Sequence, residues 1–391
     1  RWTRSGASSA ANPRTTSTST ERTDTEMTAE TFTSKVKHGA HVLLVSIMAG
    51  ANIATIILMW ATCLSTLLPP AVHPRLSQAG LLFPVFLGLD ILFLLAWLIV
   101  SWKWIALPVM GILACWNYTR DYCPFNPFDQ APAESCKILS FNVASLSNDS
   151  ANGFNGRKSV EYIANSNADI IFLQECPRSG AVFSSLKHKM DSLGYNAQYD
   201  GGLHIFSKWP FIGKPVYKKS ISFGNGSLAC LIDMDGDTTL LVNNHLQSNA
   251  ISPEEKNAYG DAIEQYDKEK MKTSGKILLS RLSTAAAKRA EQADSVCAIV
   301  ERHGKHSIIV AGDMNDTPIS YTYQRIASLL DNAFAESGNG LGISYSQKGF
   351  PVRIDHIFVS SNLVTHSTRI DGNIQSSDHR PITTRVYKSA K

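Results

Sequence analysis

The chain has 391 residues, of which 44% are hydrophobic, and its formal net charge at pH 7 is +4. This length suits either two domains or a membrane segment followed by one large globular domain. From Lys137 onward, 28 Lys and Arg residues stand against 25 Asp and Glu residues, a difference of +3 that excludes the strongly basic surface of a nucleic-acid-binding domain.

Residues 1–34 are predicted to be a disordered arm. This stretch is rich in Ser, Thr and Ala and shows no apolar periodicity. Such a composition cannot bury enough apolar surface to offset the entropy that is lost on ordering.

Residues 35–120 are predicted to form a membrane region with three helices, at about 41–68, 81–100 and 104–118. The first helix carries no charged residue, and the second carries only Asp90. Both are long enough to provide the roughly 20 helical residues that cross a bilayer. The third is shorter and has Trp and Tyr near its ends, so an interfacial or buried helix is the alternative for this segment.

The charges around these helices predict a multi-pass membrane protein with an extracytoplasmic catalytic domain, which is periplasmic if the protein is bacterial. Lys35 and Lys37 precede the first helix, and Lys103 lies in the turn between the second and the third. Positive residues favour the cytoplasmic side, so three crossings place the C-terminal domain on the other side. Arg75 and Arg120 fall on that other side and weaken the bias.

Residues 121–135 are predicted to be an extended linker, because three prolines alternate there with Asn and Asp. Residues 136–391 then form the globular domain. Apolar runs of strand length recur in this domain, and helical patterns at 160–165 and 281–302 separate some of them. The runs lie at 137–142, 169–174, 240–244, 307–311 and 354–359. Mixed strands with helices outside them predict a β-sandwich flanked by helices.

Oxygen and imidazole groups stand where these predicted strands end or begin. They are Asn142, Glu175, His245, Asp313, Asn315, Asp355, Asp378 and His379. Any one of them can be a simple turn former, since Asn and Asp close strands in many proteins. Together they bring more carboxylates to the strand ends than capping needs, and carboxylates at close range must be neutralised.

A hard divalent cation is the predicted counter-charge. Oxygen ligands from Asp, Glu and Asn favour Mg²⁺ or Mn²⁺ over Zn²⁺. The seven cysteines form no CxxC pair and have no His spacing of the zinc-site kind, so a structural zinc site is not predicted.

The order and wording of these motifs resemble the endonuclease/exonuclease/phosphatase superfamily, whose members include deoxyribonuclease I-like nucleases, sphingomyelinases and inositol-phosphate phosphatases. The resemblance covers about residues 136–388. It rests chiefly on Gly312-Asp313-Met314-Asn315, Arg353-Ile354-Asp355 and Ser377-Asp378-His379-Arg380-Pro381-Ile382. It implies an α/β fold, a four-layer α/β/β/α sandwich of the deoxyribonuclease I type, with the active site at one edge.

The resemblance also implies a metal site. Glu175 would bind the metal with Asn142 beside it, and Asp378 would complete the surroundings of the metal. There is one departure from the nuclease pattern, because Ala144 stands where many nuclease relatives carry Asp or Arg. A phosphate or metal contact is missing there, which lowers the case for a DNA nuclease.

The remaining candidates receive catalytic roles from the same resemblance. Asp313 would orient or deprotonate the attacking water, and Asn315 would hold the phosphate. Asp355 would fix the tautomer of His379, which would contact the scissile phosphate or act as the base. His245 would be the second catalytic histidine and would contact the substrate close to the leaving group. General chemistry supports the His–Asp pair independently, because a carboxylate orients an imidazole and raises its basicity.

Two other histidines and one arginine are weaker candidates for the site. His356 follows Asp355 in a strand and points to the opposite face, so it receives no catalytic part. His204 is interpreted as a satisfied core or surface histidine. Arg289 either reaches the substrate or lies on a solvated helix face.

These observations predict a membrane-anchored, metal-dependent hydrolase of phosphate esters, and a phosphodiesterase in particular. Lipid headgroups, sugar phosphates and nucleic acids are the substrate classes, because a fold fixes the bond type better than the group attached to it. The alternatives are an extracytoplasmic nuclease and a catalytically inactive membrane binding or signalling module on the same fold. The lipid bilayer is the predicted partner, and the sequence gives no evidence of an obligate protein partner.

Overall fold

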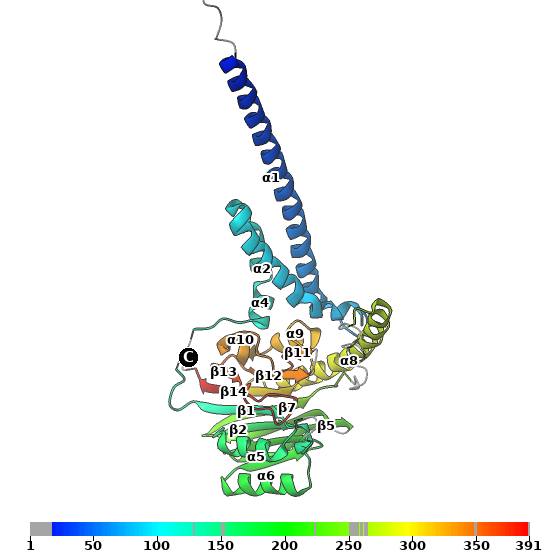
Figure 1. Cartoon of the computed structure of the whole chain (residues 1–391). Coiled ribbons are helices and arrows are strands. Elements are labelled where there is room, and N and C mark those ends of the chain that lie inside the picture. Colours follow the sequence, from blue (N-terminus) through cyan, green and yellow to red (C-terminus); the bar gives the residue numbers. More distant parts are fainter. Residues whose placement is uncertain are drawn as a thin grey trace, which may run out of the picture.

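A computed structural model describes residues 18–127, 130–149, 153–222, 224–249, 258, 261, 265–347 and 350–389. The chain consists of a helical region followed by a sandwich of two β-sheets. The helices project from one face of the sandwich (Figure 1).

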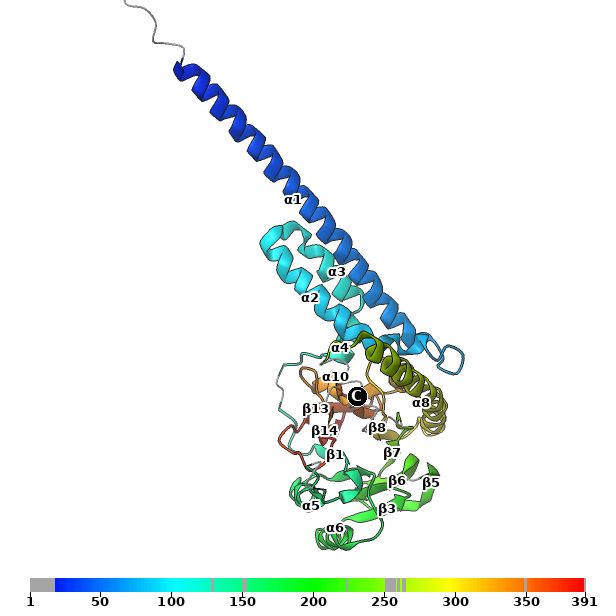
Figure 2. The ribbon, with the colours of Figure 1, turned by 45° about the vertical axis from the view of Figure 1, so that its right-hand side comes forward.

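The helical region is built from apolar helices joined by short 3-10 segments. Its elements are α1 (Thr18–Leu64), η1 (Ser65–Leu67), η2 (Leu76–Leu82), α2 (Phe83–Val100), η3 (Trp102–Ile105), α3 (Ala106–Ala114) and α4 (Trp116–Tyr122). Helices α2 and α3 lie beside the C-terminal part of α1, while the N-terminal part of α1 extends beyond them (Figure 2). Two helices, Phe32–Leu67 and Leu76–Val100, are long and apolar enough to cross a membrane by length and composition.

The helix boundaries differ from the sequence prediction at two places. Helix α1 already begins at Thr18, inside the arm predicted to be disordered, and residues 1–17 of that arm lie outside the described residues. The segment 18–38 contains no Gly or Pro, so a helix nucleated in the apolar stretch can continue through it. The predicted third helix, 104–118, is divided at Cys115, whose backbone (φ −108°, ψ 22°) is not helical.

The packed side of the helical region contains a buried polar trio. The side-chain amide of Asn52 donates to Asp90 Oδ1 at 2.7 Å, and Trp97 Nε1 donates to Asn52 Oδ1 at 3.1 Å. All three side chains are fully buried. Because each polar group joins two helices, the trio fixes the register of α1 against α2.

The first sheet has six strands in the order β13-β14-β1-β2-β4-β3. The strands are β1 (Cys136–Asn142), β2 (Ile170–Gln174), β3 (Asn196–Asp200), β4 (Leu203–Ser207), β13 (Leu363–Ile370) and β14 (Ile382–Lys388). β1 pairs in parallel with β2 and antiparallel with β14. The sheet therefore joins the two ends of the globular domain at its centre.

The second sheet has the order β5-β6-β7-β8-β12-β9. Its strands are β5 (Phe211–Ser222), β6 (Asn225–Met234), β7 (Asp237–His245), β8 (Ser307–Asp313), β9 (Asp331–Asn332) and β12 (Asp355–Val359). A separate hairpin pairs β10 (Tyr345–Gln347) with β11 (Phe350–Val352). At the β6–β7 turn, Asp235 and Gly236 both have positive φ, as a tight hairpin requires.

Helices cover the outer face of each sheet, and a hydrophobic core separates the two sheets. α5 (Gly156–Asn165) and α6 (Ala181–Ser192) pack on the first sheet, while α8 (Lys268–Arg302) and α9 (Tyr321–Ala327) pack on the second. A short 3-10 turn, η4 (Ala144–Leu146), follows β1, and α10 (Ala333–Ser337) closes the edge next to β12 and β13. The four-layer α/β/β/α sandwich implied by the sequence is confirmed (Figure 1).

The helical region docks directly on the sandwich. Arg353, which is buried, donates its guanidinium hydrogens to the carbonyls of Asp121, Tyr122 and Leu341. Asp121 and Tyr122 were predicted to begin an extended linker, but they are the last residues of α4. The prolines that suggested the linker all lie after this point, so the chain leaves the helical region two residues later than predicted.

Candidate active site

The predicted site residues meet where strands of both sheets end at one edge of the sandwich. The parallel pair β1–β2 places Asn142 beside Gln174, the residue before Glu175. The parallel pair β7–β8 places His245 beside Asp313, and the antiparallel pair β8–β12 places Asp355 opposite Asp313. Topology alone therefore gathers residues from distant parts of the chain.

Asp313 is the centre of the cluster. Its Oδ2 lies 3.6 Å from the Nε2 atoms of both His245 and His379, and the side-chain amide of Asn142 donates to it at 3.1 Å. Its Oδ1 accepts the backbone N–H of Asn315 at 2.8 Å. Burial raises the pKa of Asp313, and the two histidines oppose that rise. A carboxylate between two imidazoles is well placed to exchange protons with a bound molecule.

His379 is held by a second buried carboxylate. Its Nδ1 lies 2.8 Å from Oδ2 of Asp355, and both side chains are almost fully buried. Burial alone lowers the pKa of His379, but the carboxylates of Asp355 and Asp313 outweigh it and raise that pKa to about 10. Because the carboxylate engages Nδ1, Nε2 is the nitrogen that faces Asp313.

His245 is oriented by the backbone. Its Nδ1 lies 3.0 Å from the carbonyl oxygen of Gly224, which can only accept, so Nδ1 carries the hydrogen. Its Nε2 is then directed toward Asp313 and lies 3.7 Å from Oε1 of Glu175. The two histidines thus present the same ring nitrogen to Asp313 from different sheets.

Glu175 is the exposed carboxylate of the cluster. Its side chain is 38% exposed, whereas that of Asp313 is 2% exposed. Its Oε1 accepts the amide of Asn142 at 3.1 Å, so Asn142 bridges Glu175 and Asp313. Glu175 has a φ of 51°, a left-handed conformation that a residue other than Gly adopts only when its surroundings enforce it. Glu175 is therefore accessible from solvent, unlike Asp313.

Asn315 follows the central residue Asp313 in the chain, and Asp378 precedes the central residue His379. Asn315 also has a left-handed backbone, with φ 52°, and its side-chain amide donates to the carbonyl of Leu246 at 3.1 Å. Asp378 is partly exposed, and its Oδ1 accepts the hydroxyl of Ser377 at 3.3 Å. All eight predicted residues lie at this one edge, with Asp378 at its rim.

Gly312 explains why β8 can end so close to β7. Its φ is 134°, and a Cβ at this position would lie 2.0 Å from the carbonyl oxygen of Asn244. Only a residue without a side chain fits there, so glycine before Asp313 is a steric requirement of the site.

The match to a family model agrees with this geometry. The model described as "Endonuclease/Exonuclease/phosphatase family" matches residues 139–379, which is more than half of the chain and contains every predicted site residue. The chain belongs to the endonuclease/exonuclease/phosphatase family. Members of this family hydrolyse phosphate ester bonds and typically use divalent metals, and that reaction class applies to this chain.

Other comparisons add context to the family assignment. The helical region matches a second model, a domain of unknown function (DUF8431), over residues 45–122. Similar solved structures include truncated Caenorhabditis elegans TDP2, with 17% identity, 65% of this chain and 98% of that chain covered, and a TM-score of 0.46. A Bacteroides thetaiotaomicron family protein has 19% identity, coverage of 65% and 98%, and a TM-score of 0.44. No curated protein matches the chain.

Some features of this family member were not found by sequence reasoning. The ring of Tyr345 meets that of His379 edge-on, with centroids 5.0 Å apart, and no sequence motif marks Tyr345. Arg289 is neither at the substrate position nor on a solvated face, as its two predicted readings had it. Its side chain is 1% exposed and is paired with Asp316 at 2.9 Å.

The two histidines assigned no catalytic part lie in buried surroundings. His204 is buried among Phe183, Tyr199 and Phe206, which places it in the core, as one alternative of the prediction had it. Burial lowers the pKa of His204 to about 4. His356 is also buried, and its Nε2 lies 3.1 Å from the carbonyl of Asp316.

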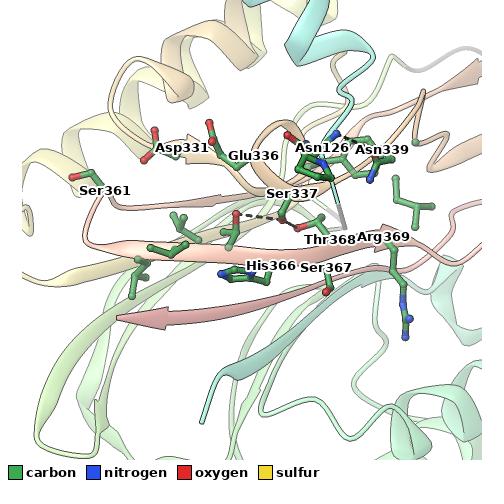
Figure 3. A pocket seen from close by; sticks show the side chains of 18 of the residues that line it. Asn126, Asp331, Glu336, Ser337, Asn339, Ser361, His366, Ser367, Thr368 and Arg369 are labelled. Carbon is green, nitrogen blue, oxygen red and sulfur yellow. Dashed lines mark hydrogen bonds between the residues drawn. The ribbon is translucent and has the colours of Figure 1, made fainter. Parts of the chain in front are cut away.

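A large cavity of this family member lies along a part of the fold that contains none of the eight site residues. It has a volume of about 1010 Å³ and lies along the β13 edge, between α10 and the segment that leaves α4 (Figure 3). Ser337 and Thr368 are hydrogen-bonded there, as are Asn126 and Asn339. Arg380, which follows His379, is among its lining residues.

Proposed function

We propose that the chain is a membrane-anchored, divalent-metal-dependent phosphodiesterase. The observation that carries the proposal is the position of Asp313, 3.6 Å from the Nε2 atoms of both histidines and bridged by Asn142 to the exposed Glu175. Phosphodiester cleavage needs a positive charge next to the non-bridging phosphate oxygens, a positioned nucleophile and a proton source. This cluster offers a metal ligand for the first and a side chain for each of the others.

The donor set fits a hard cation. Glu175 and Asn142 would hold Mg²⁺ or Mn²⁺, with Asp378 completing the surroundings from the rim. The ligand atoms of Asp313, Asp355 and His379 also lie within 4.8 Å of one another. However, Asp355 already engages His379 Nδ1 at 2.8 Å, so hydrogen bonding explains that buried group better than metal binding. When bound, the metal would neutralise the charge of the non-bridging phosphate oxygens.

The residues of the chain would then share the proton transfers. Asp313 would orient and deprotonate the attacking water, and Asn315 would hold the phosphate. His379, kept in one tautomer by Asp355, would contact the scissile phosphate. His245 would serve the leaving group, because its Nε2 faces both Asp313 and Glu175.

The helical region would anchor this site to a bilayer with three crossings. α1 and α2 are long enough to span, and the segment from η3 to α4 returns toward the sandwich (Figure 2). Lys35, Lys37 and Lys103 would then lie in the cytoplasm, and the catalytic domain would be extracytoplasmic. Fusions after Lys391 test this topology: alkaline phosphatase should be active there, and an exported fluorescent protein should be dark. The reverse pattern means an even number of crossings.

Substrate classes can be separated by one hydrolysis screen. The purified full chain would be assayed with Mg²⁺ against bis-p-nitrophenyl phosphate, p-nitrophenyl phosphate, DNA and sphingomyelin. We expect turnover of the diester above the monoester, and of the lipid above DNA, because the anchor places the site at a lipid surface. Turnover of DNA above lipid would favour the nuclease alternative. Activity on none of the four would favour an inactive binding module.

A further inference from the structure

The first half of α8 is strongly basic and carries exposed apolar side chains. Between positions 268 and 288 there are six Lys or Arg residues and one acidic residue, Glu269. The six are Lys268, Lys270, Lys272, Lys276, Arg281 and Lys288, and all are exposed. Met271, Ile277 and Leu279 are exposed on the same segment by 36%, 46% and 37%. An ordinary solvated helix face carries mixed charges and few large apolar groups. The composition of this segment is therefore typical of a surface that binds another molecule or a membrane.

The position of this segment indicates which partner. α8 contacts η2, and it extends from the sandwich to the foot of α1 and α2 (Figure 1). The turn at that foot exposes Leu67, Val72 and Leu76 by 64%, 68% and 61%. If α1 and α2 span a bilayer, this turn lies at the interface on the catalytic side, and the basic half of α8 lies at the same level.

We propose that residues 268–288 of α8 rest on the anionic headgroup surface of the bilayer that α1 and α2 enter. The cations would face lipid phosphates, and Met271, Ile277 and Leu279 would enter the interfacial layer. This inference rests on the membrane location given under Proposed function. Charge complementarity and continuity with the apolar foot favour a bilayer over a nucleic acid, which would not require exposed aliphatic side chains.

The segment is also attached to the catalytic edge. Arg289, directly after it, donates to the carbonyl of Gln247 at 3.0 Å and to Asn249 Oδ1 at 2.7 Å. Gln247 lies two residues after His245. A groove of about 510 Å³ runs between this loop and α8, lined in part by Lys276, Arg281 and Lys288. A bilayer contact along α8 would therefore hold the catalytic edge at a fixed height above the headgroups.

A site-specific fluorophore on the full chain tests the contact. Cys123 is the exposed cysteine among the seven and the other six are buried, so Cys123→Ser leaves a background in which Ile277→Cys can be labelled with bimane. The labelled chain would be reconstituted in nanodiscs of phosphatidylcholine alone or with about one third phosphatidylglycerol. We expect a blue shift and about threefold weaker quenching by acrylamide, a neutral quencher, in the anionic discs. Lys272→Glu, Lys276→Glu and Arg281→Glu together should abolish both changes.

Matched controls keep the outcomes distinct. The control for the label position is Leu193→Cys, which follows α6 in the opposite layer, and its fluorescence should not respond to lipid charge. The control for the charge change is Arg157→Glu with Lys158→Glu, which should leave the signal at position 277 unchanged. A chain that enters the discs while position 277 stays as quenchable as in detergent overturns this inference alone. A chain that does not enter discs overturns the membrane location itself. A response of the label to a DNA oligonucleotide but not to phosphatidylglycerol also overturns the bilayer assignment.

Discussion

The helical region and the sandwich place their apolar side chains on opposite sides. Among the described residues, 39 large hydrophobic side chains are exposed, and 29 of them lie between Phe32 and Phe125. The sandwich instead buries its apolar residues between and outside its two sheets. Helices with apolar outer surfaces suit a lipid environment, whereas the sandwich suits water.

Both regions nevertheless bury a polar cluster. In the helices, Asp90 has the amide of Asn52 as a partner for one oxygen, while its second oxygen has none. In the sandwich, Asp313 has donors on both oxygens and two histidines beside it. The comparison of Asp90 with Asp313 shows that burial alone does not identify a catalytic carboxylate. What distinguishes Asp313 is the number of proton-carrying groups that converge on it and a route to solvent through Glu175.

The largest expected effect sharpens this contrast at the exposed carboxylate. Glu175→Ala should lower turnover of a phosphodiester on the order of 10²–10³-fold, since it removes the proposed metal ligand. Melting temperature without metal should hold or rise, because carboxylate repulsion is relieved. The matched control is Glu301→Ala on α8, which is exposed and far from the cluster and should retain full activity. Undiminished turnover of Glu175→Ala at saturating Mg²⁺ would refute the metal assignment.

The second prediction concerns the boundary between the two regions. The sequence predicts a linker at 121–135 and a globular domain that begins at Cys136. In the structure, a fragment that begins at Cys136 leaves the buried guanidinium of Arg353 without the carbonyls of Asp121 and Tyr122. We expect urea unfolding to show residues 136–391 to be less stable than residues 116–391 by about 3 kcal/mol.

Arg353→Met separates this cause from other effects of truncation. The substitution should destabilise the 116–391 fragment, because the hydrogen bonds of Arg353 to α4 are lost. It should stabilise the 136–391 fragment, because a charge without its partners is removed. Equal stability of the two unsubstituted fragments would show that α4 contributes nothing and that the predicted boundary is adequate.

The third prediction uses His204, a buried histidine of the sandwich that lies outside the catalytic cluster. His204 has a pKa of about 4 in the folded chain, below the usual 6.5, because it is buried. The unfolded chain therefore binds more protons between pH 6.5 and 4, and stability falls as pH falls through this window. The loss should be up to about 3 kcal/mol. Denaturation of the 116–391 fragment at several pH values should show a flatter acid limb in His204→Phe, and an unchanged limb would contradict the burial effect.

The smallest expected effect lies in the helical region. Asp90→Leu should destabilise the full chain in detergent by only about 1 kcal/mol, because hydrogen bonds between helices of the proposed membrane region are individually weak. Asp90→Asn should behave like the parent chain, and Ile57→Leu on the exposed side is the control. Diester turnover should stay unchanged in all three. A large loss of turnover in Asp90→Leu would break the comparison, since it would tie the helical polar trio to the catalytic site.

The sequence was informative about the site because strand ends are local signals. Asn142, His245 and Asp313 each close an apolar run, and parallel pairing brings such ends to one edge of a sheet. The observed β1, β7 and β8 contain their predicted runs, and β2 and β12 each begin one residue after the start of theirs. The positions of the site residues could therefore be predicted from local sequence alone, without knowledge of the strand order in the sheets.

Tertiary contacts explain what the sequence did not reveal. Arg289 lies in a helix with charged neighbours, so its sequence surroundings suggest an exposed side chain. In the structure it is buried against Asp316, which lies 27 residues away in the chain. Arg353 lies beside a recognised motif, but its partners are 231 and 232 residues earlier in the chain. Hydrophobic periodicity reports which side of an element is apolar, and it contains no information on such distant pairing.

The central position of β14 in the first sheet determines the order in which the protein can be assembled. β1 pairs with β2 on one side and with β14 on the other, and β14 ends at Lys388. During synthesis, the helices are complete long before β14 and the preceding His379 leave the ribosome. β1 therefore lacks one neighbour until residues 143–381, which separate it from β14, have been made. Catalytic competence is thus among the last properties that the nascent chain acquires, long after its helical region has been synthesised.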